Sequence, residues 1–213
     1  MATRRLKQRL TAPTTPSSAL LRYRTAVLRY LDKVQALVAR NPPDLLARLA
    51  KLADQMARIS PVVARDAQRH ARAELRRLSG KPVPASLAGD RAVQAVFVEE
   101  QRRLFARLAA DIAAAPDAAA AMRLADWRAK LIAGDQTHHV YAEALAAYAP
   151  VAGSNRYVWQ TRRDERVRPK HNVVHGKSFS WSNPPAVGRH GERLHPGQDY
   201  NCRCRAVPVF AKI

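Results

Sequence analysis

The chain has 213 residues, of which 37 are Lys or Arg and 17 are Asp or Glu, so its formal net charge is +20. This length allows one good core, or a helical domain together with a small second one. A surface with so much positive charge repels itself, so the expected partner is a polyanion. Nucleic acid is the leading candidate. The alternative is a compositional bias toward arginine that spreads the charge over ordinary solvated faces.

Two cysteines separated by one residue exclude a disulfide framework. Residues 1–17 mix basic residues with Thr, Pro and Ser, and they predict a flexible basic arm without the apolar segment of a signal peptide. No stretch approaches the apolar length needed to cross a bilayer. We therefore expect a soluble protein, made in a reducing cytosol, with no membrane partner.

The segment from residue 18 to residue 150 is predicted to be all helical, because its apolar residues recur at helical spacing. A serine at position 17 or 18 can cap the first helix. The Pro-Pro-Asp run at 42–44 ends this helix and begins the second one. Ser60-Pro61 repeats that start signal and predicts a third helix, for which Gly80 is a suitable C-terminal cap.

Two further boundaries are predicted in the second half of this region. After a proline-containing break, a long helix is expected from about Gly89 to Ala114. Pro116-Asp117 begins another helix that ends at Gly134. Asp135 then caps a last helix, which reaches the end of the region.

From residue 151 the pattern changes, since Gly, Pro, Asn and His become frequent and helical periodicity stops. Residues 156–162 and 203–210 alternate in the manner of strands. The turn-rich excursion between them, about forty residues long, exceeds what an idle loop needs. The predicted fold class is therefore α+β: an all-helical N-terminal region, then a small mixed module at 151–213 with a short antiparallel sheet and long loops.

Cys202 and Cys204 are two positions apart, so on a strand they lie on the same face. Their sulfurs could bind one zinc ion together with His171. The fourth ligand would come from His175, His190 or His195, of which we select His195. The alternative is a pair of small core cysteines, because Cys-x-Cys departs from the usual ligand spacing and Cys is often fully buried.

A basic turn surrounds Asp164. Its five cations could contact nucleic-acid phosphates without base specificity; they are Arg162, Arg163, Arg166, Arg168 and Lys170. In the structural interpretation, Asp164 accepts hydrogen bonds from the turn backbone and pairs with Arg166 or Arg168. We favour the structural role for Asp164 and leave the role of the cations open.

Other residues of the module are expected to build its framework. Trp159 and Trp181 are predicted to form the aromatic core of the module, and Gly176 is predicted to occupy a turn that requires a positive φ.

Catalysis is the alternative function for the same residues. His171, Asn172 and His175 beside a zinc site are ingredients of a metal-dependent nuclease. However, carboxylates that could act as general bases are scarce in the module, where they are Asp164, Glu165, Glu192 and Asp199. No nuclease spacing is recognisable, and we predict that the protein is not an enzyme.

Several ordered motifs of the module resemble those of bacteriophage Mu F-like minor head proteins, also called phage head morphogenesis proteins. The resemblance covers roughly residues 125–210. Its main motifs are Trp159-x-Thr161, Asp164-x-Arg166-x-Arg168-x-x-His171, Gly176-x-x-Phe179 and Cys202-Arg203-Cys204.

The resemblance implies a minor capsid protein of a tailed phage or prophage. Such a protein assembles in the procapsid near the portal and influences DNA packaging or ejection. The implied partners are the portal and the coat or scaffold proteins, together with double-stranded DNA bound without sequence preference. The implied location is the virion head, and the host cytoplasm during assembly.

The resemblance also carries His171, Cys202 and Cys204 over as the ligands if the module binds zinc. Two other functions remain open at this point. One is a metal-dependent nuclease or toxin-like effector that uses the His and Cys residues of the module. The other is a protein that contacts the portal or coat alone.

Overall fold

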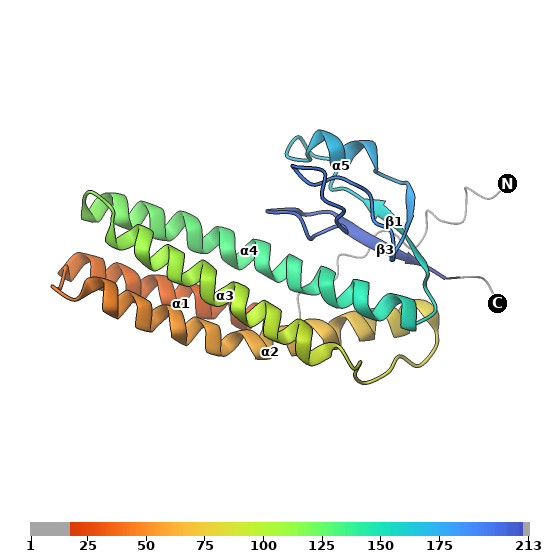
Figure 1. Ribbon diagram of the computed structural model, residues 1–213, viewed down its shortest axis with the longest axis horizontal. Helices are drawn as coiled ribbons and strands as arrows, with labels where there is room; N and C mark the ends of the chain where they lie inside the picture. The colour runs from red at the N-terminus through yellow and green to blue at the C-terminus, as the bar shows by residue number, and fades with distance from the viewer. Residues whose placement is uncertain (1–17, 211–213) are drawn as a thin grey trace.

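The computed structural model describes residues 18–210, and the predicted basic arm at 1–17 lies outside them. The described residues form four long helices, one short helix and three strands (Figure 1). The long helices are α1 (Ser18–Arg40), α2 (Leu45–Ser79), α3 (Asp90–Ala113) and α4 (Ala118–Val151). Between residues 18 and 210, no helix has the length and apolar character that crossing a membrane requires.

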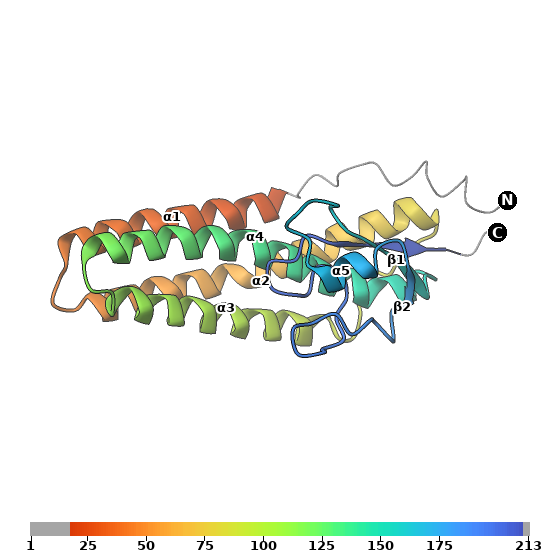
Figure 2. The same cartoon turned by 90° about the horizontal axis from the view of Figure 1, so that it is seen from above.

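The four long helices lie side by side in an elongated bundle (Figures 1 and 2). Short connections join α1 to α2 and α3 to α4, so each of these pairs is antiparallel. Each helix buries an apolar stripe, and aromatic rings join the stripes of different helices. Tyr30 of α1, for example, meets Phe105 of α3 edge-on, with ring centroids 5.0 Å apart.

A chain of buried polar side chains crosses the bundle. The Tyr23 hydroxyl on α1 donates to Oε1 of Gln101 on α3, and Nε2 of Gln101 donates to Oε1 of Gln136 on α4. All three side chains are buried. Because an unpaired buried amide is unfavourable, this network favours one alignment of the three helices over its alternatives.

The predicted helix boundaries at Gly80 and Asp117 are confirmed, as are the break at 42–44 and the long helix expected at about 89–114. Gly80 follows α2 with a φ of 70°, and its N–H donates to the carbonyl oxygen of Arg76. Asp117 precedes α4, and its carboxylate accepts a hydrogen bond of 2.7 Å from the N–H of Ala120.

The predicted helix start at Ser60-Pro61 is wrong, because α2 runs through both residues. The Ser60 hydroxyl donates to the Met56 carbonyl of the preceding turn and so caps no new helix. Met56 before Pro61 and Val63 after it are buried in the same core. Tertiary packing therefore holds the helix together where the proline removes a backbone hydrogen bond.

The predicted boundary at Gly134 and Asp135 is also wrong, since α4 continues to Val151. The Asp135 side chain accepts instead from the backbone N–H of Asn201 in the C-terminal module. The carboxylate of Asp135, which the sequence suggested as a helix cap, therefore forms a tertiary contact.

The C-terminal module contains one antiparallel sheet, which confirms the α+β class. Its strands are β1 (Arg156–Gln160), β2 (Ser178–Ser180) and β3 (Arg205–Val209), in the order β2-β1-β3. Tyr157 of the central strand pairs with Phe179 on one side and Pro208 on the other. Pro208 lies on an edge strand, where its missing N–H is tolerated.

The module rests on the C-terminal half of α4 (Figure 1). Gln198 donates to Glu143 of α4 at 2.6 Å. The backbone of Gly197 approaches the same helix so closely that a Cβ there would lie 3.0 Å from Cβ of Ala142. Buried residues of bundle and module belong to one continuous apolar cluster, so the helices serve as a platform for the loops of the module.

Candidate functional site

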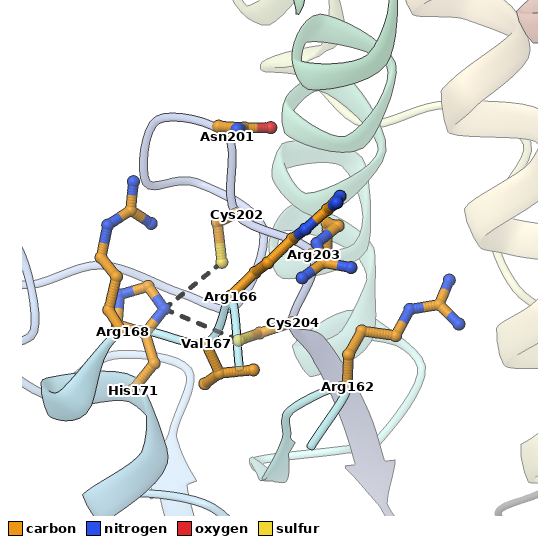
Figure 3. Close-up of a pocket in the computed structure, with 9 residues that line it drawn as sticks. All are labelled: Arg162, Arg166, Val167, Arg168, His171, Asn201, Cys202, Arg203 and Cys204. Atoms are coloured by element: carbon orange, nitrogen blue, oxygen red, sulfur yellow. Dashed lines mark hydrogen bonds between the residues drawn. The ribbon is translucent and has the colours of Figure 1, made fainter. Parts of the chain in front are cut away.

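Three side chains of the module converge in its interior: those of His171, Cys202 and Cys204 (Figure 3). Nδ1 of His171 lies 3.6 Å from Sγ of Cys202 and 3.6 Å from Sγ of Cys204. The three side chains belong to residues that are only 1%, 3% and 8% exposed. We call this group the His-Cys-Cys cluster.

Two short elements bring these side chains together. The helix α5 (Pro169–Val173) follows β1 and precedes β2 along the chain. It carries His171 and has Pro169 at its first position. Both cysteines precede β3, in a segment whose turn is closed by the Cys202 N–H donating to the Asp199 carbonyl at 3.0 Å. Asn201 within this turn has a φ of 52°, a conformation that Asn tolerates better than most residues.

Asp199 fixes the second nitrogen of the His171 ring. Its Oδ2 lies 3.1 Å from Nε2 of His171, and 3.5 Å from Nη1 of Arg168. An ionised carboxylate only accepts hydrogen bonds, so this contact assigns the ring proton to Nε2. The lone pair of Nδ1 is then directed toward the two sulfurs.

The surroundings of Cys202 favour its thiolate. The hydrogen bond from the Cys204 thiol is the main cause that lowers the pKa of Cys202, and His171 and the backbone of Cys204 and Gly197 act in the same direction. The same thiol–thiolate bond raises the pKa of Cys204. Since the thiolate is the form that binds metals and reacts, the cluster presents at least one competent sulfur.

Trp159 covers the cluster on the side of the sheet. It is fully buried, and its ring meets that of His171 edge-on at 5.3 Å. Its Nε1 has no hydrogen-bond partner of adequate geometry among the described residues. It is nevertheless close enough to Cys204 to lower the pKa of that thiol, against the larger opposite effect of Cys202. This N–H is therefore a buried donor without a full hydrogen bond among the described residues.

The structure does not bring the predicted fourth ligand, His195, to the cluster. Nδ1 of His195 lies 3.2 Å from the Tyr157 hydroxyl, and the His195 ring lies 5.4 Å from that of Trp181. The other two candidates are also engaged elsewhere or exposed: Nδ1 of His175 lies 3.0 Å from the backbone nitrogen of Thr161, and His190 is exposed. Within residues 18–210, the group of potential ligands thus has three members.

A pocket opens from the cluster to the surface, and arginines form much of its lining (Figure 3). The arginines are Arg162, Arg166, Arg168 and Arg203. Beside them the lining contains the cluster itself, Val167 and Asn201, and no carboxylate of a described residue. The mouth of the pocket is therefore positively charged.

Asp164 has the structural role that the sequence suggested, but with a different partner. Its Oδ1 accepts from the Arg166 backbone N–H at 3.2 Å. Its carboxylate pairs with both terminal nitrogens of Arg203, at 2.6 Å and 2.7 Å, and this hydrogen bonding lowers its pKa. The expected partners, Arg166 and Arg168, do not form this pair; Arg203 is 39 positions away, so no local spacing could indicate it.

The five predicted phosphate-binding cations differ in their surroundings. Arg168 donates to the Tyr200 carbonyl, Lys170 donates to the Gly188 carbonyl at 3.0 Å, and Nε of Arg163 lies 2.9 Å from Nε2 of His175. Arg162 and Arg166 are exposed and form no ion pair with another described residue. Phosphate binding by these residues stays a prediction.

The predicted framework residues lie where the sheet and its loops meet. Trp159 and Trp181 are buried as expected, and so is Thr161. Gly176 has the expected positive φ, at 75°, and its N–H donates to the Trp159 carbonyl at 2.8 Å. Phe179 of β2 stands opposite Tyr157, as the register requires.

Comparison with known proteins gives the family. The family model described as phage Mu protein F like protein matches residues 98–207, more than half of the chain. The chain belongs to the phage Mu F-like family. The matched region includes all of α4, β1, β2, the first residues of β3 and the His-Cys-Cys cluster, so the candidate site lies within the Mu F-like region.

One curated relative of this Mu F-like chain is an uncharacterised protein of Haemophilus influenzae. It is 40% identical over 83 residues, which cover 39% of this chain and 17% of the relative. This chain thus matches a small part of that longer protein. No solved structure matches the chain.

Proposed function

We propose that this Mu F-like protein is a minor capsid protein in the head morphogenesis of a tailed phage or prophage, and that it assembles in the procapsid near the portal. The observation that carries this proposal is the family match across residues 98–207. The proposed partners are the portal and the coat or scaffold proteins, and the proposed location of the protein is the virion head.

We further propose that the arginine-lined face of the module contacts packaged double-stranded DNA without sequence preference. Arg162 and Arg166 support this, because both are exposed at the pocket mouth without an ion pair to a described residue. The net charge of +20 adds a long-range attraction to a polyanion. Phosphate contacts of this type position a protein on DNA but do not select a sequence.

Bond-breaking chemistry forms no part of this proposal. A general base near the cluster would need an available carboxylate or imidazole. Asp199 is engaged by His171 and Arg168, and Asp164 is paired with Arg203. Both carboxylates are thus committed to holding the loops in place.

DNA contact is tested by measuring binding to a duplex of random sequence at several salt concentrations. The logarithm of the affinity should fall linearly with the logarithm of the salt concentration, with a slope of about 0.9 per phosphate contacted. Replacing Arg162 and Arg166 by Gln together should reduce this slope by about 2. The matched control is the replacement of Arg58 and Arg107 by Gln, two exposed arginines of α2 and α3, which removes the same charge elsewhere.

Equal effects of the two double variants would show that net charge alone, and not this face, drives binding. Binding absent at low salt would remove the DNA proposal. Cleavage of the duplex in the presence of divalent metals, abolished by His171→Ala, would favour the nuclease alternative.

The head-assembly proposal is tested in the phage or prophage that encodes the chain. Deleting its reading frame should reduce the yield of filled, infective particles, and mass spectrometry should find the protein in purified heads of the parent phage. Particles that form, fill and infect normally without it would contradict the proposal, whatever the outcome of the DNA experiment.

A further inference from the structure

Two distances in the His-Cys-Cys cluster, those from Nδ1 of His171 to the two sulfurs, match the nitrogen–sulfur edges of a metal tetrahedron. Zinc binds His nitrogen at about 2.0–2.1 Å and Cys sulfur at about 2.3 Å, so tetrahedral angles separate the nitrogen from each sulfur by roughly 3.6 Å. The structure gives 3.6 Å for both pairs.

Hydrogen bonding alone explains this geometry less well. Nδ1 of a neutral imidazole has one lone pair, which can accept one hydrogen bond along its own direction. Here two sulfurs lie at the same distance from it. A single cation placed between the three atoms accounts for both distances at once.

Asp199 supports the same conclusion from the opposite side of the His171 ring. Imidazoles that bind metals usually donate their second N–H to a carboxylate or a carbonyl, which fixes the tautomer and the direction of the ring. Oδ2 of Asp199, 3.1 Å from Nε2 of His171, is in that position. Arg168, 3.5 Å from the same carboxylate oxygen, pairs with Asp199 and helps to hold it in place.

We propose that His171 Nδ1, Cys202 Sγ and Cys204 Sγ bind one Zn²⁺ ion, whose fourth position faces the arginine-lined pocket and takes a water molecule or a small anion. Two thiolates and an imidazole form a soft donor set that suits zinc. Zinc also provides a permanent acceptor, the Cys204 thiolate, for the buried N–H of Trp159. This inference goes beyond the proposed function and can fail while the head-assembly proposal stands.

The fourth position is assigned to an external ligand because of the residues around it. Among the described residues, the ligand group has no further His, Cys, Asp or Glu member. The pocket lining supplies arginine side chains instead, which cannot bind a metal ion but attract anions. The site therefore combines a closed set of protein ligands with one exchangeable position.

The first experiment measures metals in the full chain, expressed without added zinc and purified without chelators. We expect about one zinc per chain, lost in Cys202→Ser, Cys204→Ser and His171→Ala. The control is His195→Phe, which removes a histidine of the module that lies outside the cluster and should keep the metal. Absence of zinc, with both thiols free or oxidised to a disulfide, would overturn the proposal, and so would stoichiometric binding of a different metal.

Asp199→Asn separates metal binding from simple folding of the loops. This variant keeps all three ligands, and its side-chain carbonyl can still accept the proton of His171. We expect zinc affinity to fall by about 10- to 100-fold, measured by competition with a chelating dye. An unchanged affinity would contradict the assigned role of Asp199. Far-UV circular dichroism checks that the four-helix bundle is intact in each variant.

Cobalt substitution tests the coordination directly. Co²⁺ added to the metal-free chain should give thiolate-to-cobalt charge-transfer absorption and the intense visible bands of a four-coordinate site. Azide should shift the visible bands, because it replaces the exchangeable ligand, and the shift should need more azide in the Arg162→Gln/Arg166→Gln variant. Visible bands insensitive to azide would overturn the open fourth position, and weak bands of a six-coordinate ion would overturn the site.

Discussion

His195 shows how burial changes the chemistry of one residue. It lies between Tyr157 and Trp181 in the aromatic core of the module. Burial disfavours its charged form and lowers its pKa from 6.5 to about 4. In the unfolded chain the pKa returns to its ordinary value, so below pH 6.5 the unfolded chain binds a proton that the folded protein does not. The free energy of unfolding is therefore unaffected by His195 above pH 6.5 and decreases as the pH falls from 6.5 toward 4.

We therefore predict that replacing His195 by Phe makes the protein less sensitive to acid. Between pH 7 and pH 5, the parent should lose about 2 kcal/mol more of its free energy of unfolding than the variant does. Urea unfolding at the two pH values measures this difference. Both proteins carry the same His-Cys-Cys cluster, so effects of the cluster cancel, and a His190→Gln variant should behave like the parent. Equal pH dependence in the parent and His195→Phe would contradict the assigned burial.

At this scale, the sequence predicted that His171, Cys202 and Cys204 lie together, but it wrongly added His195 and did not predict the residues that support the cluster. Cys202 and Cys204 were expected on one face because they are two positions apart, and His171 was expected with them. Asp199 was considered only as a scarce carboxylate, since its role depends on a turn that brings it to a helix 28 residues earlier. The pairing of Asp164 with Arg203 escaped prediction for the same reason.

Among the elements, α2 is distinguished by a proline in its interior. Pro61 has no N–H to donate to the preceding turn, and its ring crowds that turn, so it destabilises a continuous helix. The buried residues on either side of it, Met56 and Val63, hold the two parts of α2 on one line.

We predict that Pro61→Ala stabilises the protein by about 1–3 kcal/mol, because it restores one hydrogen bond inside the helix. Thermal unfolding followed by circular dichroism would show a higher Tm. The matched control is Pro43→Ala, at an exposed position before the helix begins, where no stabilisation is expected. A lower Tm for Pro61→Ala would mean that the bundle requires the distortion that the proline introduces.

Local sequence signals located helices more reliably than they located helix ends. The ends at Gly80 and Asp117 were predicted correctly because the cap residues act on their own backbone. Ser60 and Asp135 carry the same side-chain chemistry but use it elsewhere, one along its own helix and the other across to Asn201. A cap and a tertiary contact look alike in a single sequence.

On the scale of the whole molecule, bundle and module share one core. Polar contacts between them include Asp135 with Asn201 and Glu143 with Gln198. Glu74 of α2 also pairs with Arg205 of β3, at 3.7 Å. The sequence showed a change of composition near residue 151, but it held no information on how closely the two parts pack.

We predict that bundle and module unfold in a single cooperative transition. The helices are followed by far-UV circular dichroism, and the module by the fluorescence of Trp159 and Trp181 in a Trp127→Phe variant. Trp127 is 59% exposed on α4, so this replacement should leave the core intact. The two curves should coincide during urea unfolding. Fluorescence that changes at lower urea than the helical signal would show that the module opens independently.

The order of the strands in the sheet also determines the order in which the sheet can form during synthesis. The central strand β1 has its partners β2 and β3 on either side, and both emerge from the ribosome after it. The helical bundle can close while the nascent chain still lacks them. Trp159 and His171 therefore stay partly exposed until Cys202 and Cys204 have been synthesised. During that interval a chaperone or a nearby assembly partner would encounter the nascent chain in this form.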